Sequence, residues 1–390
     1  MISTFIRKVE LQRLITKNFS SKMKLLSYQP FSLYSNSGGS RILRRLYQGY
    51  ESQVNSLVLE ANYWTAPKGL ILERTVAASP QGHKYYRWYV RTCVTWLREK
   101  KFRLRNINRV QKEAANIEHD IIHVINHGPF SGALCKSRIR LKKQLWVSFH
   151  DHFSTTGSTQ DDARELWKQA DRRLVISNAL GVEYSRLFGY RNFEIITDGV
   201  KKEELSIVNP ELNDELVIYF AGLLHLEYLP LFKALAEALD LLVRQGLKIK
   251  LVLRGTQQVS FLKNRLFAVE YKSVSFDEKE LKEELDAAAI LYLPIKFSPS
   301  EFSLYSLSTK MVGYLSSSGA ILYHGPENGA ACLLLQETGS AECCTSLNVQ
   351  DLTKAILSLI NHRQVLSENA KHLAERQFNI LDIQKRFWLA

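Results

Sequence analysis

The chain has 390 residues, of which 45% are hydrophobic and 23% charged, a composition typical of a globular protein with about two domains. Apolar runs stay below the ~18–20 residues of a membrane-spanning helix, and residues 1–22 lack the apolar core of a secretory signal. The five cysteines form no CxxC pair, which argues against a disulfide framework or a zinc site and predicts a reducing cytoplasm.

The first half of the chain alternates apolar strands with helical segments. Residues 1–22 are either a basic amphipathic extension or a stretch upstream of a start at Met23. A domain at residues 23–199 follows and ends near the turn Asp198-Gly199. Its expected strands are 24–29, 120–125, 144–150 and 172–177, and its expected helices are 41–48, 162–171 and 179–189.

The second half repeats this alternation in residues 200–365. Its expected strands are 216–221, 248–253, 289–294 and 320–323, with helices at 229–244, 311–315 and 352–359. Residues 295–310 are expected to form an irregular loop, and residues 363–388 are expected to be helical, with 366–390 as the C-terminal helix. Strands that alternate with helices of this length predict an α/β protein with a doubly wound parallel sheet in each domain.

Positive charge is concentrated in the first half. Residues 1–200 hold 32 Lys and Arg against 16 Asp and Glu, whereas the remainder holds 20 against 23. Ten basic residues lie between Lys84 and Lys112, interleaved with tyrosine, tryptophan and phenylalanine. This segment is either a surface helix that packs an aromatic stripe into the core or a helix that lies on an anionic membrane. Nucleic-acid binding is the third and least favoured reading.

Polar residues in the first domain follow the ends of predicted strands, where ligands of open α/β sheets bind. Gly38 and Gly39 come at a helix start, where backbone N–H groups favour a phosphate. His127 follows one strand, and His150 and Asp151 follow the next. Imidazoles and a carboxylate here suit orientation of sugar hydroxyls and acceptance of a proton. His150 and His152 have no clear third ligand, so we expect no metal site.

The second domain offers two cations and a glycine-rich turn in equivalent places. Lys310 stands at the start of a short helix, and Arg254 ends the strand KIKLVLRG. Both could contact a phosphate. Gly325 and Glu327 lie in the turn after the next strand, where Glu327 could bind a sugar hydroxyl. Each residue could equally be an ordinary surface or turn residue.

The stretch from Ser308 to Ser317 resembles the donor-binding half of GT-B glycosyltransferases, especially the family-four group of nucleotide-sugar enzymes. Many of these carry Pro-Ser-Lys before a helix of the form Glu-Tyr-Leu-Ala-x-Gly, and a Gly-Gly loop after the first strand. The resemblance implies two Rossmann-like domains that face a central cleft, with a final helix that crosses back to the first domain. It also implies that Gly222 stands where the family has a glycine in the donor site.

The chain departs from this family pattern at three positions of the donor site, and the first of the family's paired glutamates falls on Tyr305. Leu223 stands where the family has an arginine, and Glu227 stands about where it has a lysine. Gly313 takes the place of a glutamate that holds the donor ribose. Three explanations are open: the donor differs, Arg254 and Lys310 bind the phosphates instead, or catalysis is impaired.

From the resemblance we expect an enzyme that transfers a hexosyl group from a nucleotide sugar to a glycan or lipid-linked acceptor, in cell-surface polysaccharide synthesis. Such enzymes usually retain the anomeric configuration and need neither metal nor cofactor, because helix ends and basic side chains neutralise the leaving group. We expect a cytoplasmic protein, peripheral on the inner face of the cell membrane through 84–112. The alternatives are an impaired GT-B scaffold or partner subunit, and a nucleic-acid-binding protein.

Overall fold

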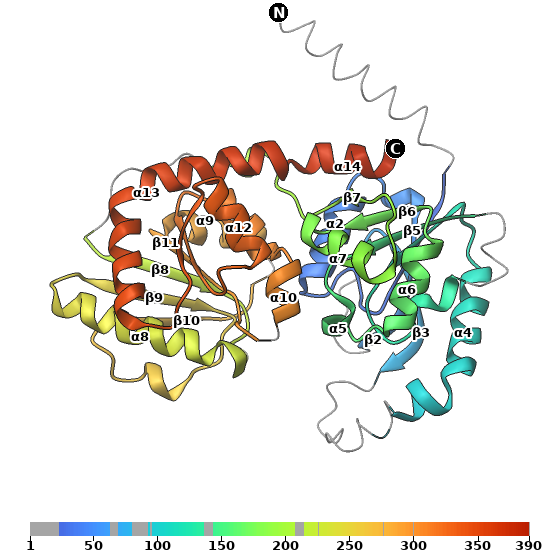
Figure 1. Ribbon diagram of the computed structural model, residues 1–390, viewed down its shortest axis with the longest axis horizontal. Coiled ribbons are helices and arrows are strands. Elements are labelled where there is room, and N and C mark those ends of the chain that lie inside the picture. Colours follow the sequence, from blue (N-terminus) through green and yellow to red (C-terminus); the bar gives the residue numbers. More distant parts are fainter. Residues whose placement is uncertain are drawn as a thin grey trace, which may run out of the picture.

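A computed structural model of the chain shows two α/β domains (Figure 1). It describes residues 23–62, 69–79, 93, 96–135, 143–206, 214–224, 226–275, 277–298 and 300–389. The basic extension at 1–22 and most of the aromatic segment 84–95 lie outside these residues. The expected α/β class, with a doubly wound parallel sheet in each domain, is confirmed.

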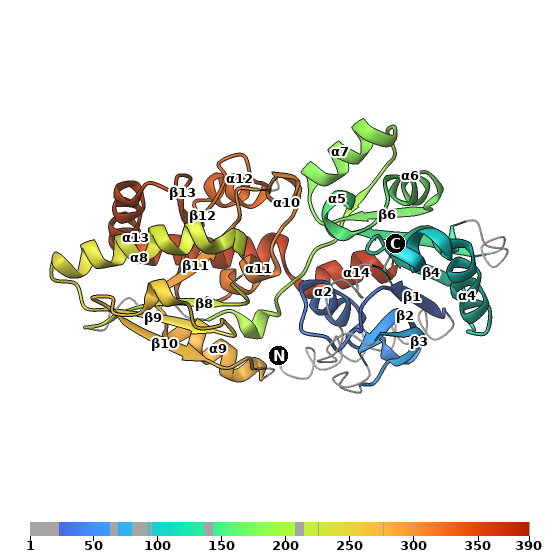
Figure 2. The same cartoon turned by 90° about the horizontal axis from the view of Figure 1, so that it is seen from below.

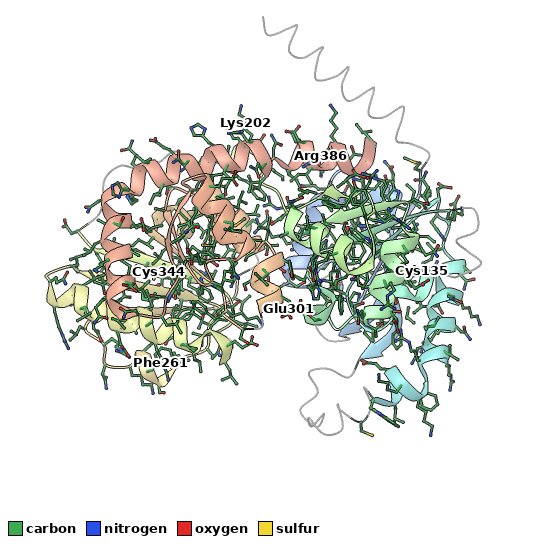
Figure 3. The ribbon with its side chains drawn as sticks, viewed as in Figure 1. Cys135, Lys202, Phe261, Glu301, Cys344 and Arg386 are labelled. Carbon is green, nitrogen blue, oxygen red and sulfur yellow. The ribbon has the colours of Figure 1, made fainter. Side chains whose placement is uncertain are left out.

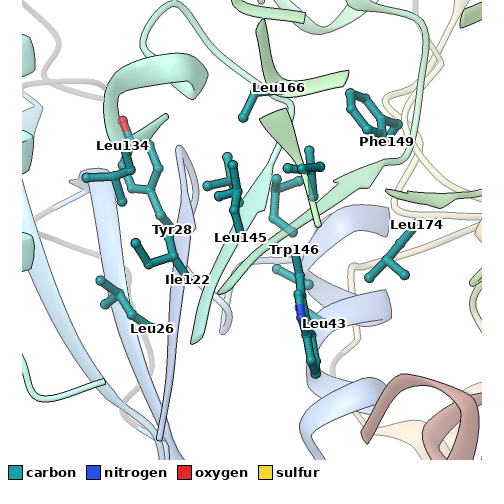
Figure 4. Close-up of a cluster of buried hydrophobic side chains, with 14 of the residues drawn as sticks. Leu26, Tyr28, Leu43, Ile122, Leu134, Leu145, Trp146, Phe149, Leu166 and Leu174 are labelled. Carbon is teal, nitrogen blue, oxygen red and sulfur yellow. The ribbon is translucent and has the colours of Figure 1, made fainter. Parts of the chain in front are cut away.

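The first domain contains a seven-stranded parallel sheet in the order β3-β2-β1-β4-β5-β6-β7. Its strands are β1 Leu25–Gln29, β2 Val54–Asn62, β3 Leu72–Ser79, β4 Ile121–Ile125, β5 Gln144–Phe149, β6 Arg172–Val175 and β7 Glu194–Ile195. Its helices are α2 Gly38–Tyr47, α4 Arg103–Ala115, α5 Phe153–Thr156, α6 Gln160–Gln169 and α7 Asn178–Phe188. Apolar side chains from the sheet and these helices form one core, part of which Figure 4 shows around Leu26, Leu145 and Trp146.

The second domain contains a six-stranded parallel sheet in the order β10-β9-β8-β11-β12-β13. Its strands are β8 Leu216–Ala221, β9 Ile249–Arg254, β10 Ala268–Lys272, β11 Ile290–Pro294, β12 Ala320–His324 and β13 Ala341–Cys344. Its helices are α8 Leu229–Arg244, α9 Glu278–Ala287, α10 Ser300–Tyr305, α11 Thr309–Leu315 and α12 Ala330–Glu337.

The two faces of this second sheet carry separate cores, because successive side chains of a strand point to opposite faces. Ile218 and Phe220 of β8 join a core with α8. Tyr219, between them in sequence, joins the core with α11 and α12 on the other face. Both faces are therefore covered, as parallel sheets require.

The chain passes between the domains twice, and the two passages lie side by side. The first runs through Gly199 and Val200, and the second joins α13 (Val349–Gln377) to α14 (Ile380–Leu389). Val200 N–H donates to the carbonyl of Phe378 over 2.7 Å, and Ile380 N–H donates to the carbonyl of Val200 over 3.0 Å. Gly199 has no room for a side chain, since a Cβ would lie 2.9 Å from the backbone of Ile380.

Helix α14 packs on the first domain, as Figure 1 shows along the upper edge of the molecule. Phe387 and Trp388 belong to the first domain's core, and the Trp388 indole donates to the carbonyl of Leu46 over 2.8 Å. The second domain is thus tied to the first by a helix that belongs to the first domain's core.

Several elements differ from the expected ones. Helix α2 begins at Gly38 rather than 41. Helix α13 joins the helix expected at 352–359 to the first part of the helical tail expected from 363, and α14 forms the last part. The loop at 295–310 contains the helix α10. Strands β2, β3, β7, β10 and β13 were not predicted from the sequence.

We predict that Phe387→Ala lowers the free energy of unfolding by about 3–5 kcal/mol, because it removes a fully buried ring from the first domain's core. Chemical denaturation followed by tryptophan fluorescence would measure this. Leu389→Ala is the matched control, since Leu389 lies on the same helix but is 47% exposed. Equal losses from both substitutions would mean that α14 does not rely on this packing.

Candidate functional site

Each sheet has one place where the strand order reverses, and both reversals bear on the candidate site. In the first sheet β1 lies between β2 and β4, and in the second β8 lies between β9 and β11. Loops that leave the carboxyl ends of such strand pairs separate and open a crevice, which is where open α/β sheets bind ligands. Gly38, His127, Gly222 and Lys310 come after the carboxyl ends of β1, β4, β8 and β11, respectively.

Gly38 and Gly39 form the first turn of α2. Ser37 caps the helix, and its side chain accepts the N–H of Ser40. Within the described part of the chain, no acceptor is recorded for the N–H groups of Gly38 and Gly39, which are therefore available to an anion. Both positions are too tight for a side chain: a Cβ on Gly38 would lie 2.9 Å from the Thr309 hydroxyl, and one on Gly39 2.6 Å from the Phe31 ring.

Thr309 belongs to the second domain, so the Gly38 contact brings the two domains together. Helices α2 and α11 lie side by side (Figure 2). Lys310 follows Thr309 in α11, so the contact joins the start of α11 to the start of α2. That Lys310 and the glycines of α2 bind the same diphosphate stays a prediction.

The Lys310 ammonium lies against Gly222, where a Cβ would be only 2.6 Å from Nζ. Nζ also lies 4.4 Å from the centroid of the Phe220 ring. Among the described residues it has no carboxylate or hydrogen-bond acceptor. Burial lowers the pKa of Lys310 to about 8, so the side chain is still mainly protonated at pH 7. A desolvated, uncompensated cation of this kind favours binding of an anion.

His127, His150 and Asp151 form a second cluster, at the ends of β4 and β5. The rings of His127 and His150 are 6.0 Å apart, and His127 Nε2 lies 3.6 Å from Asp151 Oδ2. Burial lowers the pKa of His127 to about 4 and that of His150 well below its usual value, so both rings are neutral at pH 7. Burial raises the pKa of Asp151 to about 6, against the opposing charge of Lys296.

Several polar atoms of this cluster are buried and lack a partner. His127 Nε2, His150 Nδ1 and His152 Nε2 have no hydrogen bond from the described residues. Buried polar groups are almost always satisfied, so a concentration of exceptions marks a place where a polar ligand fits. The cluster connects to the glycine helix through Phe31, whose ring meets His127 edge-on at 5.9 Å.

Helix α10 completes this side of the site. Its residue Tyr305 has its ring 5.4 Å from that of His152, and its carbonyl accepts a hydrogen bond from Ser177 over 2.5 Å. Figure 3 shows Glu301 of the same helix at the boundary between the two domains. The sequence analysis did not assign His152, Tyr305 or Ser306 to the site, although the His-Asp-His spacing was visible.

Arg254 is used elsewhere. Its guanidinium donates to Glu284 through Nε and Nη2, to Glu280 over 2.8 Å and to the carbonyl of Ser273 over 2.7 Å. It is only 7% exposed. We therefore leave Arg254 out of the proposed phosphate site, because its hydrogen-bonding capacity is already committed to a structural ion-pair network.

The surroundings of Gly325 and Glu327 do not test the roles that were predicted for them. Gly325 packs against the backbone of Ile295, where a Cβ would lie 2.7 Å from the carbonyl oxygen. This close approach explains the glycine without a ligand. Glu327 is exposed, and the structure gives it no hydrogen bond with another described residue.

The three departures from the family pattern can be placed. Leu223 is 59% exposed, and Glu227 forms an ion pair with Lys296, with 2.8 Å between Oε2 and Nζ. Gly313 is covered by the first domain's Arg41, whose Nη2 would lie 3.5 Å from a Cβ at that position. Cations thus lie near two of the altered positions, although they come from other segments of the chain.

No group of three or more His, Cys, Asp or Glu side chains in the described ranges is placed to hold a metal ion. The same ranges contain no helix long and apolar enough to cross a bilayer. The candidate site thus consists of the Lys310 ammonium, the N–H groups of Gly38 and Gly39, and a cluster of two neutral imidazoles and a carboxylate.

Comparisons with known proteins give a sequence-family match in the first domain and fold matches over both domains. The family model described as Glycosyltransferase Family 4 matches residues 62–204, which is most of the first domain. No curated protein matches the chain in sequence.

Solved structures match over both domains. HepE from Anabaena, crystallised with UDP, is 13% identical with a TM-score of 0.64, over 94% of this chain and 98% of that one. Trehalose-6-phosphate synthase from E. coli, bound with UDP-2-fluoro glucose, is 13% identical with a TM-score of 0.63, over 93% and 98%. The α,α-trehalose-phosphate synthase from Burkholderia xenovorans is 11% identical with a TM-score of 0.64, over 94% and 99%. The resemblance drawn from the sequence is confirmed: the chain has the GT-B glycosyltransferase fold, and its first domain matches the Glycosyltransferase Family 4 model.

Proposed function

We propose that the protein is a glycosyltransferase that moves a hexosyl group from a nucleotide sugar to a glycan or lipid-linked acceptor. The observation that carries this proposal is the Lys310 ammonium, which lies against Gly222 without an ion-pair partner among the described residues. Thr309, the first residue of the same helix, contacts the first turn of α2. A diphosphate would satisfy both the ammonium and the free N–H groups of Gly38 and Gly39.

A uridine diphosphate sugar is the donor that we would test first. HepE was crystallised with UDP and with UDP-glucose, and the E. coli trehalose-6-phosphate synthase with UDP-2-fluoro glucose. These proteins share the fold, and the diphosphate is the part of such donors that Lys310 can recognise.

In the proposed reaction the bond between the anomeric carbon and the phosphate oxygen breaks, and the acceptor hydroxyl oxygen bonds to that carbon. Lys310 and the α2 N–H groups stabilise the charge that develops on the leaving diphosphate. His127 and His150, both neutral, orient hydroxyl groups. Asp151 accepts the proton of the acceptor hydroxyl, for which a pKa of about 6 is suitable near neutral pH. The resemblance implies retention of configuration and no metal requirement.

A peripheral membrane location on the inner face of the cell membrane would suit a lipid-linked acceptor. In the part of 84–112 that the structure describes, Trp96, Phe102 and Leu104 are exposed beside a pocket lined by Arg105, Arg109 and Lys112. Exposed aromatic and basic side chains together favour an anionic bilayer. Cosedimentation with vesicles that contain phosphatidylglycerol, compared with neutral vesicles, tests this part of the proposal.

An impaired GT-B scaffold is the second candidate, because Leu223 and Glu227 stand where cations are expected. The two functions differ in nucleotide binding and turnover. A scaffold would bind UDP weakly or not at all in a thermal-shift titration, and it would transfer no sugar from a panel of labelled nucleotide sugars to membrane extract.

We predict that Lys310→Ala weakens UDP binding about 10- to 100-fold, the effect of losing one charge-assisted hydrogen bond. UDP binding favours the protonated lysine, so the wild-type affinity is fully present below pH 8 and falls as pH rises through about 8. Isothermal titration calorimetry from pH 6.5 to 9.5 would show this fall, and the variant would lack it.

Lys263→Ala serves as the control, because Lys263 is an exposed lysine of the same domain. It should bind UDP as the wild type does over the whole pH range. If Lys310→Ala also bound UDP like the wild type, the phosphate site would have to be moved elsewhere.

We predict opposite effects of Asp151→Asn on activity and stability. Turnover should fall about 10²- to 10⁴-fold, since the proton acceptor is lost. Folding raises the pKa of this carboxyl from 3.8 to about 6, so the folded state loses stability as pH rises between those values. The substitution should therefore increase the free energy of unfolding at pH 7.5 by roughly 1–3 kcal/mol.

Chemical denaturation at pH 7.5 and at pH 3.5 would measure this gain, which should disappear at the lower pH because the carboxyl is then protonated in both states. An unchanged turnover with the expected gain in stability would show that Asp151 is buried but has no catalytic role.

A further inference from the structure

A second cavity lies on the side of α2, at the boundary between the domains. Its volume is about 310 Å³, near the lower end of the range for small-molecule sites. Four basic side chains from α2 and the interdomain passage line it, together with Tyr34 and two glutamates. The lining residues used below are Tyr34, Arg41, Arg44, Arg45, Lys201 and Glu278.

Arg44 and Lys201 are the two basic residues of this cavity that lack an ion pair among the described residues, and Arg44 presents the larger hydrogen-bonding group. One of its guanidinium nitrogens, Nη1, donates to the carbonyls of Leu33 and Ser35 over 2.5 and 3.0 Å. These bonds fix the plane of the group. The edge formed by Nε and Nη2 is left without a recorded acceptor, and such an edge binds a carboxylate or phosphate through two parallel hydrogen bonds.

Two of the four basic side chains are held in ion pairs, whereas Arg44 and Lys201 face the cavity together with the carboxylates of Glu51 and Glu278, and no ion pair joins these four among the described residues. Arg45 is paired with Glu204 through both terminal nitrogens, and Arg41 is paired with Asp198 over 2.8 Å. The pKa of Arg44 is lowered by burial, and Arg41 and Arg45 add to this lowering, while Glu278 opposes it. A guanidinium held close to two others gains free energy when an anion joins it.

The rest of the cavity suits a small polar ligand with a ring. The Tyr34 hydroxyl accepts the N–H of Ile71 over 2.7 Å, and the Tyr34 ring lies against Gly69. Glu278 reaches the cavity from the second domain, at the first turn of α9. Its carboxylate can accept hydrogen bonds from hydroxyl groups, and Tyr34 offers an aromatic face to a sugar ring.

We propose that this cavity binds a monosaccharide-sized ligand that carries a phosphate or carboxylate group, with the anionic group on the free edge of Arg44. The site is separate from the Lys310 site and does not depend on the nucleotide-sugar activity. The two sites approach each other at Arg41, which lines the cavity and also covers Gly313 of α11. The ligand is either a second substrate or an effector that binds at the domain boundary.

The test is isothermal titration calorimetry on the full chain with glucose 6-phosphate, glucuronate, inorganic phosphate and glucose. We expect at least one of the three anions to bind at least ten-fold more tightly than glucose. Arg44→Gln should weaken that binding at least ten-fold, while Arg44→Lys, which keeps the charge but loses the two-nitrogen edge, should give an intermediate value. The exposed Arg186 provides the control, Arg186→Gln, which should bind like the wild type.

Lys201→Ala is a second variant in case Arg44→Gln does not fold, because Lys201 lines the cavity from the interdomain passage. It should weaken anion binding several-fold. Lys310→Ala should leave anion binding unchanged, and Arg44→Gln should leave UDP binding unchanged, so failure of this site and failure of the donor site are distinguishable.

The four ligands separate the sources of the anionic group. Equal affinity for inorganic phosphate and glucose 6-phosphate would identify a free-phosphate site, whereas tighter binding of glucose 6-phosphate or glucuronate would identify a sugar ligand. The proposal is overturned if none of the anions binds at millimolar concentration, or if Arg44→Gln binds them as tightly as the wild type.

Discussion

The reversal of strand order beside β1 and again beside β8 is the constraint on which the rest of the structure depends. A parallel sheet built outward in both directions from a central strand must separate its connecting loops at that strand. Here this occurs once in each domain, and the paired passages through Val200 and Phe378 hold the domains together. The contact between Gly38 and Thr309 then follows from two helices that leave these two points.

The electrostatics of the candidate site differ from those of the ion pairs elsewhere in the chain. Arg254 and Glu284 are mutually satisfied, and each shifts the pKa of the other toward the charged form. Lys310, His127 and Asp151 all shift toward the neutral form because burial dominates. Groups that lose solvation without gaining a partner destabilise the folded protein, and such groups concentrate at functional sites.

Sequence patterns located most strands of both sheets and the α/β class, because parallel strands buried on two faces are continuous apolar runs. Strands β2 and β3 escaped this pattern because polar residues lie within them. Ser56 of β2 accepts a hydrogen bond from Gln29 over 2.7 Å, and Glu73 of β3 binds the loop before α2 through Ser32 and Leu33. These partners are far apart in sequence, so the burial of such polar residues could not be predicted from the local pattern.

The site itself was predictable in part for the same reason. Lys310 and Gly38 could be assigned because each follows a strand end and stands at a helix start, which are local features. The commitment of Arg254 to Glu284 could not be, since it depends on how α9 packs beside β9. Tyr305 and Ser306 were missed because a helix, α10, lies where the sequence pattern indicated an irregular loop.

At two of the departures from the family pattern, a cation from another segment of the chain lies near the altered position. Glu227 faces Lys296, whose charge also acts on Asp151. At Gly313 the loss of a carboxylate leaves room for Arg41, which Asp198 holds in place from the passage between the domains. A scaffold that binds no ligand would have no need of an unpaired lysine at Gly222 or of a cation near two of the altered positions. Retention of a desolvated cation is costly in stability, and this cost favours a site that still binds an anionic ligand.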